Sequence, residues 1–293
     1  MKHELKKISF CPVCGSDKQE HFMSAKDHNV SGDLFSLSCC GDCGFVYTNP
    51  IPTEKTIGKY YQSEEYVSHS GTKKGIINKV YHLVRAHQIK RKEQLIGALS
   101  NEKSLLDIGC GTGEFLGFCQ KKGWSVYGTE PDEKARLFSK KTYIKENIYE
   151  KGLEKEGVSV ITMWHVLEHV YNLDNDLNQI NSLIKPGGHL LVAVPNRLSY
   201  DAKYYKNNWA AYDVPIHLYH FRKKDIETLF KTYGFELIKV KPLIFDAIYI
   251  SLLSERKRNG SSLRAIFIGV LSNLSAIFTK NYSSLIYVLK KKE

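Results

Sequence analysis

From residue 104 to residue 194 the chain alternates between short apolar runs and helical patterns, and this alternation constrains its fold more than any other feature. The apolar runs are SLLDIG, WSVYGTE, VSVITM and HLLVAV, and helical segments begin between them at Glu114, Asp132 and Leu173. Such alternation predicts an α/β domain, a Rossmann-like and mostly parallel sheet with helices on both faces. Lys185–Gly188 is predicted to form the turn from a helix to the next strand.

The first strand of this series ends in a glycine-rich turn. Asp107 is followed by Gly109, Gly111 and Gly113, and the second strand ends at Glu130. Glycine permits a tight turn and lets the backbone approach a ligand closely at the positive end of a helix. A carboxylate at the end of the second strand can accept hydrogen bonds from both hydroxyls of a ribose. This order of residues indicates a ligand that contains a nucleoside, although glycine turns of this kind also occur in sheets that bind nothing.

Two nucleoside ligands compete for this turn. A dinucleotide site has the spacing Gly-x-Gly-x-x-Gly, and Glu114 stands where its third glycine would be. Asp107 at the strand end would sit awkwardly against a pyrophosphate but well against a cationic ligand. The residues therefore favour S-adenosylmethionine.

The segment LDIGCGTGEF resembles motif I of the class I S-adenosylmethionine-dependent methyltransferases, and the similarity extends over roughly Ser104 to Glu236, with the final strand also fitting. The resemblance implies a seven-stranded sheet whose last strand is antiparallel. It implies that Asp107 and the glycines line the methionine end of the cofactor, that Glu130 holds the ribose, and that the residues after the third strand lie near adenine. The implied cofactor-binding residues are Asp107, Gly109, Cys110, Gly111, Gly113, Glu130, Pro131, Asn147, Ile148, Trp164 and His165.

Two further segments carry candidate catalytic side chains. MWHVLEHV resembles the segment that lines cofactor and substrate in ubiquinone-type O-methyltransferases, and it contains His165, Glu168 and His169. Glu168 and His169 act there as a divalent metal pair, as a base with its orienting partner, or as supports of the loop. DVPIHLYHF contains His217 and His220. Neutral His217 is the favoured general base, and the alternative is that both histidines brace the loop.

The first fifty residues contain two Cys-x-x-Cys pairs, each followed by glycine. Cys11 with Cys14 and Cys40 with Cys43 match the spacing of a tetrahedral zinc site. Four protein ligands leave no position for water, so the expected zinc is structural. Cys39 leaves open which thiolate completes the tetrahedron. Similar chains with a zinc knuckle include sugar C-methyltransferases, which makes a glycosyl or other small-molecule acceptor the expectation.

The chain is expected to have three parts: a zinc-binding module at 1–52, a helical linker or lid at 53–100, and a methyltransferase domain at 101–293 with a C-terminal helical insertion at 243–281. The linker helix is expected to pack through one stripe, formed by Ile76, Val80, Leu83, Val84 and His87. A helix at 263–278 has a second apolar face. The favoured interpretation is that this face packs in the core, and the alternatives are a membrane surface or another subunit. Its apolar residues are Leu263, Ile266, Phe267, Val270, Leu271, Leu274 and Phe278.

The formal net charge of +11 favours polyanions or anionic membrane surfaces without establishing either. The chain lacks a signal pattern at its start, so a cytoplasmic protein is expected. Trp209, Tyr212 and Tyr219 either wall the acceptor site or pack in the core. The leading function is methyl transfer from S-adenosylmethionine to an oxygen or carbon of a small molecule, such as a sugar or a lipid-linked precursor. Methylation of RNA or protein and a non-catalytic nucleotide-binding scaffold are the alternatives, and the oligomeric state stays open.

Overall fold

The computed structural model describes residues 4–61, 76–139, 143–150 and 157–293, with the backbone alone for 76–83, so the predicted positions of the Ile76, Val80 and Leu83 side chains lie outside it. The strands are β1 (Leu5–Lys6), β2 (Gln19–Lys26), β3 (Leu34–Cys40), β4 (Val46–Thr48), β5 (Ile51–Pro52), β6 (Ser104–Ile108), β7 (Ser125–Thr129), β8 (Ile144–Lys145), β9 (Val158–Trp164), β10 (Ile184–Pro195), β11 (Tyr219–His220), β12 (Phe235–Pro242) and β13 (Ser284–Lys291). The α-helices are α1 (Glu54–Ile57), α3 (Ile76–Gly97), α4 (Glu114–Lys121), α5 (Glu133–Ser139), α6 (Leu173–Leu183), α7 (Tyr200–Tyr205), α8 (Lys223–Thr232), α9 (Asp246–Lys257) and α10 (Ser262–Thr279). Short 3₁₀ turns are η1 (Gly58–Tyr61), η2 (Leu167–His169), η3 (Lys206–Asn208) and η4 (Ala210–Tyr212).

Seven strands form the central sheet, in the order β12-β13-β10-β9-β6-β7-β8. The strands from β6 to β10 pair in parallel, whereas β13 runs antiparallel to both β10 and β12. The expected fold is confirmed, including the antiparallel last strand. The chain winds outward from β6 in one direction and from β9 in the other, so the loops that follow β6 and β9 diverge and leave a crevice at the carboxyl edge.

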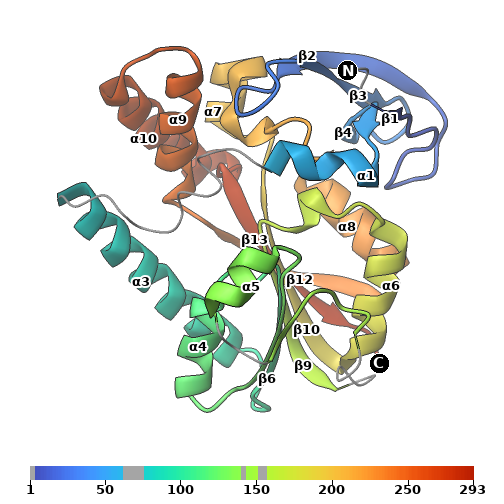
Figure 1. Cartoon of the computed structure of the whole chain (residues 1–293), viewed down its shortest axis with the longest axis vertical. Helices are drawn as coiled ribbons and strands as arrows, with labels where there is room; N and C mark the ends of the chain where they lie inside the picture. The colour runs from blue at the N-terminus through green and yellow to red at the C-terminus, as the bar shows by residue number, and fades with distance from the viewer. Residues whose placement is uncertain (1–3, 62–75, 140–142, 151–156) are drawn as a thin grey trace.

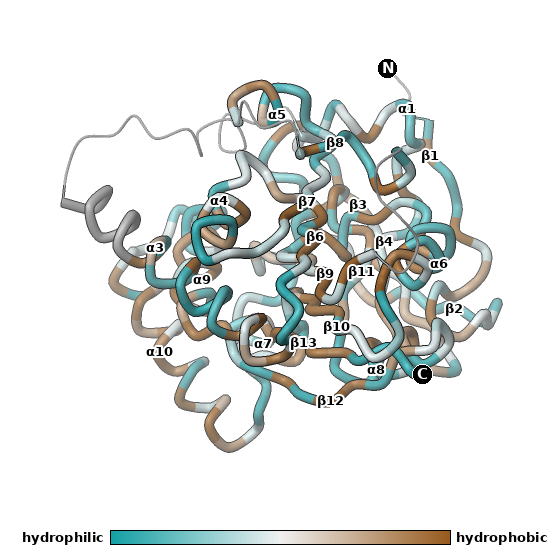
Figure 2. The backbone as a smooth tube through the Cα atoms, turned by 90° about the horizontal axis from the view of Figure 1, so that it is seen from below, coloured by the Kyte–Doolittle hydropathy of each residue, from teal (hydrophilic) through white to brown (hydrophobic). Residues whose placement is uncertain are grey.

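Helices cover both faces of this sheet (Figure 1). On one face α6 and α8 pack on the strands through residues such as Leu177 and Phe230, and on the other α3 and α4 pack through Ile96 and Leu116. Figure 2 shows the strands β6 and β9 as hydrophobic segments within the molecule. All residues of β9 before Trp164 are buried, as expected for a strand covered on both faces.

Lys185–Gly188 is part of a strand, whereas the sequence predicted a turn that connects a helix to the next strand. α6 ends at Leu183 and β10 begins at Ile184, so the four residues belong to the strand. The pairing of β10 with β9 shifts register between Ile184 and His189. Gly187 has a φ of 70°, which favours glycine. The proline and glycines therefore form an irregularity inside β10 rather than a connection before it.

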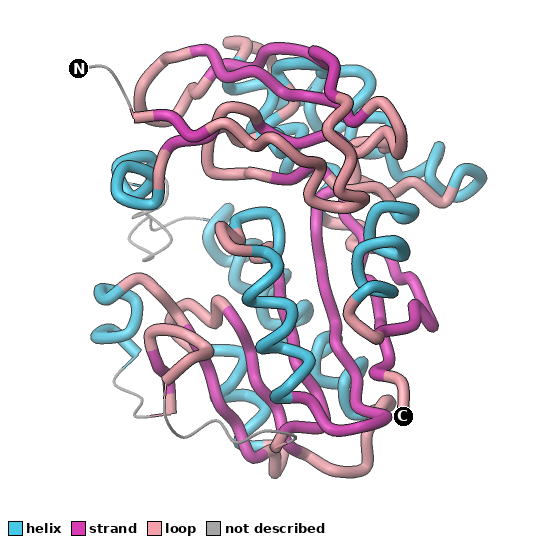
Figure 3. Tube along the Cα trace, turned by 90° about the vertical axis from the view of Figure 1, so that its right-hand side faces the viewer, coloured by secondary structure: helices cyan, strands magenta, loops and turns pink. Residues whose placement is uncertain are grey.

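The N-terminal module, here residues 4–52, lies against one edge of the central sheet (Figure 3). Its strands β2, β3 and β4 form an antiparallel sheet, and the fourth strand of that sheet is β11, from far along the chain. The Thr48 amide donates to the Leu218 carbonyl at 2.9 Å. The amide of Leu218 in turn donates to the carbonyl of Glu168, which follows β9, at 2.8 Å. The module is therefore joined by backbone hydrogen bonds to the carboxyl edge of the sheet.

In the hairpin of α9 and α10, the last helix buries the opposite face from the one expected. α10 packs on α9 through small residues, and a β-carbon on Gly269 would lie 2.7 Å from the Ile248 Cα. Large side chains would prevent this approach, so they point outward and the prediction that they pack in the core is wrong. By length and composition alone, α10 is the one described helix that could cross a membrane. The exposed residues are Leu263, Ile266, Phe267, Val270, Leu274, Ile277 and Phe278, whereas Leu271 is partly buried.

Candidate functional site

The glycine turn after β6 has the backbone that its sequence predicts. Gly109, Gly111 and Gly113 have φ values of 70°, 55° and 69°, a region in which side chains with a β-carbon are strained. A β-carbon on Gly109 would lie 2.4 Å from Cγ2 of Val166, in the loop after β9. A β-carbon on Gly111 would have no neighbour within 4 Å among the described atoms. Gly109 therefore allows two loops to meet, and Gly111 faces open space that a ligand can enter.

The amides of this turn bind the protein itself, which differs from the expectation that they approach a ligand. The amides of Gly109 and Cys110 donate to the Thr129 carbonyl at 2.7 and 2.9 Å. The Gly111 amide donates to Oε2 of Glu130 at 2.8 Å, and Oε1 of Glu130 accepts from a backbone amide two residues on. Each carboxylate oxygen has a second lone pair, so Glu130 is held in place and can still accept hydrogen bonds from a ribose.

Asp107 is a buried carboxyl group at the end of β6, with 2% of its surface exposed. Burial raises its pKa to about 7, although a 2.6 Å hydrogen bond from Oγ1 of Thr162 and the ammonium of Lys92 each oppose the rise. Lys92 comes from α3, and its Nζ lies 4.2 Å from the centre of the Trp164 ring. A buried carboxyl with one nearby cation is a site that a positively charged ligand would stabilise.

The remaining predicted cofactor residues occupy different environments. Pro131 is exposed, and its carbonyl accepts from Arg136 at 2.7 Å. Asn147 is exposed and accepts from the backbone amide of the second residue after it. The side chain of Ile148 is 5% exposed and packs in the core on the α6 face of the sheet. Trp164 has a buried Nε1 that finds no acceptor among the described residues.

His165 is held between two carboxylates. Its Nδ1 lies 3.3 Å from Oε1 of Glu168, and its Nε2 lies 3.1 Å from Oδ2 of Asp246, the first residue of α9. Burial acts to lower the pKa of His165, but the two carboxylates outweigh it and raise the pKa to about 10. The imidazole is then a cation with both nitrogens engaged, which suits an orienting role better than proton abstraction. Asp246 was missed by sequence reasoning because nothing near it in the chain resembles a motif.

Glu168, His169 and His217 form a compact group. One possible ligand atom from each lies within 4.8 Å of the other two, and the two imidazole rings meet edge to face with centroids 4.6 Å apart. Burial, with His217 nearby, lowers the pKa of His169 to about 4, and burial also lowers the pKa of His217. Both imidazoles are therefore neutral near pH 7, although they come from segments of the chain that were predicted separately.

His220 is joined to this group through Thr48, and the three aromatic residues are buried. The Nε2 of His220 lies 3.1 Å from Oγ1 of Thr48, and that hydroxyl donates to the His217 carbonyl at 2.7 Å. Tyr212 meets the His220 ring edge to face. Trp209, Tyr212 and Tyr219 are all buried, and Trp209 donates to a buried carboxylate of α7. This geometry is that of packing and bracing rather than of an exposed acceptor wall.

The four predicted zinc ligands meet in the N-terminal module. The sulfur atoms of Cys11, Cys14, Cys40 and Cys43 lie within 4.8 Å of one another, whereas Cys39 stands outside the group. The amides of the two glycines that follow the pairs donate back to Cys11 and Cys40 at 2.9 Å, which forms the turns of two knuckles. Four thiols converging at this distance fit a tetrahedral zinc site. The Cys-x-x-Cys spacing had favoured Cys40 and had left Cys39 as the alternative, and the structure places Cys40 in the group.

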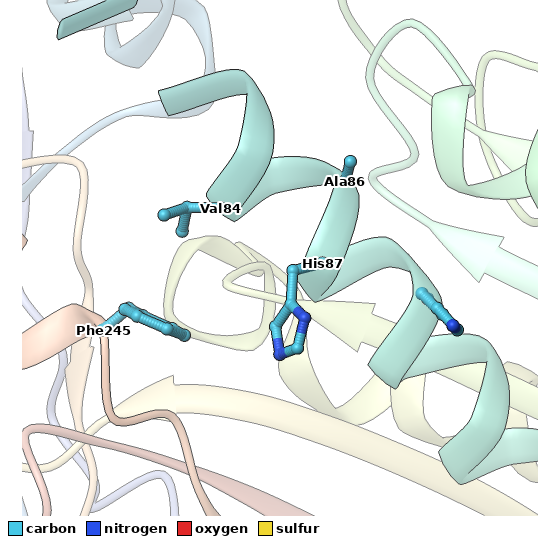
Figure 4. A pocket seen from close by; sticks show the side chains of 5 residues that line it. Val84, Ala86, His87 and Phe245 are labelled. Carbon is cyan, nitrogen blue, oxygen red and sulfur yellow. The ribbon is translucent and has the colours of Figure 1, made fainter. Parts of the chain in front are cut away.

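An open cavity of about 580 Å³ lies between α3 and the residue before α9 (Figure 4). His87 and Phe245 face each other across it, with ring centroids 6.4 Å apart. The next residue is Asp246, which pairs with His165. The cavity therefore opens beside the residues that follow β9. Its lining residues are Val84, Ala86, His87, Lys90 and Phe245.

Comparison with known proteins gives one family. Residues 81–240 match the family model described as a methyltransferase domain. Ubiquinone biosynthesis O-methyltransferases from Vibrio parahaemolyticus and Photorhabdus laumondii are 36% and 33% identical over 105 and 106 residues. These matches cover 32% of this chain and 45% and 44% of the relatives, so the chain spans less than half their length. Geranyl diphosphate C-methyltransferase from Streptomyces coelicolor has the same fold at 12% identity, with a TM-score of 0.51 over 72% of this chain and 80% of that one.

Proposed function

Because the chain belongs to the family of methyltransferase domains, we propose that it transfers a methyl group from S-adenosylmethionine to an oxygen or carbon of a small-molecule acceptor. The observation that carries this proposal is the crevice after β6 and β9. A carboxyl group suited to a cation lies there beside an open glycine turn, and two neutral histidines, His169 after β9 and His217 before β11, lie close together.

In this proposal the cofactor lies along the carboxyl ends of β6 and β7. Its ribose hydroxyls donate to Glu130, whose carboxylate is already held by two backbone amides. Its cationic methionine end lies over the open side of Gly111 and near Asp107, where it adds a second positive charge to that of Lys92 and favours the ionised carboxylate. Lys92 and Trp164 then border the methyl group.

The acceptor is proposed to enter beside His169, the partly exposed member of the histidine pair. Methyl transfer is an in-line displacement, so alignment and exclusion of water supply most of what the reaction needs. The acceptor atom passes its proton to the neutral imidazole of His217, the favoured base, and attacks the methyl carbon. The bond from carbon to sulfur breaks, and its electron pair stays on sulfur to give S-adenosylhomocysteine. His165, a fixed cation, orients Glu168 in this scheme.

The test uses zinc-loaded protein with S-adenosylmethionine labelled in its methyl group, incubated with a bacterial extract that is then separated by size. We expect label in molecules below roughly 1 kDa, with sugars and lipid-linked precursors as the first fractions to analyse. A Glu130→Ala variant is the control, because it removes the ribose contacts while leaving the histidines in place. Label confined to RNA or protein would replace the proposal with macromolecular methylation, and cofactor binding without any transfer would favour a scaffold.

A further inference from the structure

The outward face of α10 is a continuous apolar surface at the outer edge of the molecule (Figure 1). Each of its large apolar side chains is between 43% and 86% exposed. Arg264, in the first turn, is the one charged residue of α10. Monomeric soluble proteins rarely expose a contiguous apolar surface of this length, so a partner is expected to cover it. The side chains are those of Leu263, Ile266, Phe267, Val270, Leu274, Ile277 and Phe278.

The exposed apolar residues continue onto the start of α9. Nδ2 of Asn273 on α10 donates to the Ile244 carbonyl at 2.8 Å, so the two segments contact each other there. Ile244, Phe245 and Tyr249 are 39%, 37% and 50% exposed. Phe245 also lines the cavity beside α3 (Figure 4). The apolar residues of the hairpin therefore extend to the edge of that cavity.

Basic residues border the hairpin at both ends of α10. Arg256 and Arg258 are exposed near the turn from α9 to α10, and Lys280 is exposed directly after α10. Residues 243–281 contain five basic and two acidic residues. The apolar surface is therefore flanked by an excess of positive charge.

The two acidic residues of the hairpin do not offset this charge at the surface. Glu255 is 1% exposed and accepts two hydrogen bonds from the Arg264 guanidinium, at 2.9 and 2.8 Å. Oδ2 of Asp246 lies 3.1 Å from Nε2 of His165. Both carboxylates are engaged by partners within the fold, so a surface that approaches α10 meets mainly positive charge.

We propose that the outward face of α10 binds the surface of an anionic lipid bilayer. The apolar side chains enter the boundary between headgroups and acyl chains, and the basic residues lie at the level of the headgroups. A helix with one apolar face and basic flanks lies in the membrane interface in this way. Each basic residue near an anionic surface strengthens binding roughly fivefold. This inference does not rest on the proposed methyl transfer.

A second copy of the chain fits the surface less well. A twofold axis brings the same surface of two copies together, so the basic borders at Arg256, Arg258 and Lys280 would come together as well. Like charges placed together across an interface weaken it. An anionic bilayer complements both the apolar face and its basic border.

In this proposal α10 lies along the bilayer, although its length and composition alone would allow it to cross one. Its inner face is held by the rest of the fold. Gly269 packs so closely on Ile248 that a β-carbon would lie 2.7 Å from the Ile248 Cα. The Ser272 hydroxyl donates to the buried carboxylate of Asp201 at 2.7 Å. A crossing helix would lose these contacts and would leave the Asp201 carboxylate without one of its donors.

The experiment measures binding of the full-length, zinc-loaded protein to sedimenting vesicles. Vesicles of phosphatidylcholine with roughly 30% phosphatidylglycerol are expected to bind it at least about tenfold more tightly than pure phosphatidylcholine, and less tightly as salt rises. Phe267→Ser combined with Phe278→Ser should weaken binding at least about tenfold. The matched control is Leu137→Ser combined with Phe138→Ser on α5, where the two side chains are 68% and 72% exposed, and it should bind as the wild type does.

A second pair of variants tests the charge. Arg256→Gln combined with Arg258→Gln should weaken binding to the anionic vesicles roughly 10- to 30-fold and leave binding to pure phosphatidylcholine unchanged. Lys121→Gln combined with Lys122→Gln removes the same charge near the end of α4 and should change binding by less than about threefold. Thermal unfolding and S-adenosylmethionine binding verify that every variant is folded.

Three results would overturn the inference: a wild-type chain that does not bind the anionic vesicles, a folded double-phenylalanine variant that binds them as tightly as the wild type, or an α5 control that loses as much binding. Sedimentation velocity without lipid identifies the competing partner. A wild-type dimer that the double-phenylalanine variant converts to a monomer, with no vesicle binding, would assign the face to a second copy. S-adenosylmethionine binding and methyl transfer are separate readouts, so failure of the membrane surface leaves the proposed function standing.

Discussion

The proposed cofactor side and the proposed acceptor side of the crevice are built in different ways. Asp107, the glycine turn and Glu130 come from one strand, one turn and the next strand, and amides of the turn donate to Glu130 and to the residue before it. The acceptor side combines η2, the loop before β11, and α9, and it is braced by Thr48 of the N-terminal module. A continuous segment needs little outside help to form its site. The acceptor side, by contrast, forms only when separate elements meet, including the N-terminal module and α9.

This contrast can be tested because the two sides have separate readouts. S-adenosylmethionine binding reports on the cofactor side, and hydrogen exchange of β4 and β11 reports on the acceptor side. Destabilising substitutions in the module or in the α9–α10 hairpin should first increase hydrogen exchange on the acceptor side. Damage to the glycine turn should weaken the cofactor side.

The largest effect is expected from loss of the zinc site. Cys40→Ser removes one of four converging thiols, and binding of a structural zinc contributes on the order of 10 kcal/mol to folding in small modules. We expect zinc content to fall and amides of β4 and β11 to exchange at least about a hundredfold faster, while S-adenosylmethionine affinity changes by less than about threefold. Metal analysis and hydrogen exchange measure these outcomes.

Cys39→Ser is the matched control for that change, because Cys39 lies next to Cys40 but outside the group. It should retain zinc and wild-type exchange. If Cys40→Ser abolished cofactor binding as well as zinc binding, the two sides would not form independently.

Gly109→Ala should give the next largest effect. The added carbon would lie 2.4 Å from Val166 and would require a residue with a β-carbon at a φ of 70°. A loss of roughly 3 kcal/mol in the free energy of unfolding is expected, from backbone strain and overpacking together. Gly111→Ala meets open space and should lose only about 1 kcal/mol, from strain alone. Urea unfolding of the two variants measures the difference, and equal losses would contradict the close approach at Gly109.

A smaller effect is expected in the α9–α10 hairpin. Gly269→Ala places a carbon 2.7 Å from the Ile248 backbone and should cost roughly 2 kcal/mol, because the two helices must separate. Phe278→Ser on the outward face should change stability by less than about 0.5 kcal/mol, because 86% of its surface is exposed. Thermal unfolding compares the two. A large loss from Phe278→Ser would mean that the outward face is covered in solution.

The smallest effect concerns pH and the cofactor. The pKa of Asp107 is raised to about 7, so its negative charge is present above pH 7 and is lost as pH falls below it. A cationic ligand binds the ionised form, and protons compete with it. S-adenosylmethionine affinity should therefore fall roughly tenfold between pH 8 and pH 6, or about 1.4 kcal/mol. Calorimetry at both pH values measures this. Asp107→Asn should bind weakly at both, and a wild-type affinity independent of pH would remove Asp107 from the cofactor site.

Residues that are close in sequence allowed the strand, the glycine turn and the position of Glu130 to be predicted. The strand, the glycine turn and the acid at Glu130 specify one another through backbone geometry that depends on few distant contacts. Spacing along the chain did not predict which way the side chains after the third strand point. Ile148 is predicted to lie near adenine, and the structure adds that its side chain packs in the core, which spacing along the chain did not indicate.

The sequence by itself determined the α/β alternation, the glycine turn and the pairing of cysteines, because each depends on local geometry or fixed spacing. Only the tertiary structure decided which face of α10 is buried, that Asp246 clamps His165, and that Glu168, His169 and His217 converge. The physical reason is that these contacts join segments separated by tens of residues. These contacts depend on how closely two backbones can approach and on which buried polar groups still lack a hydrogen-bond partner. Neither property can be read from a single segment of the sequence.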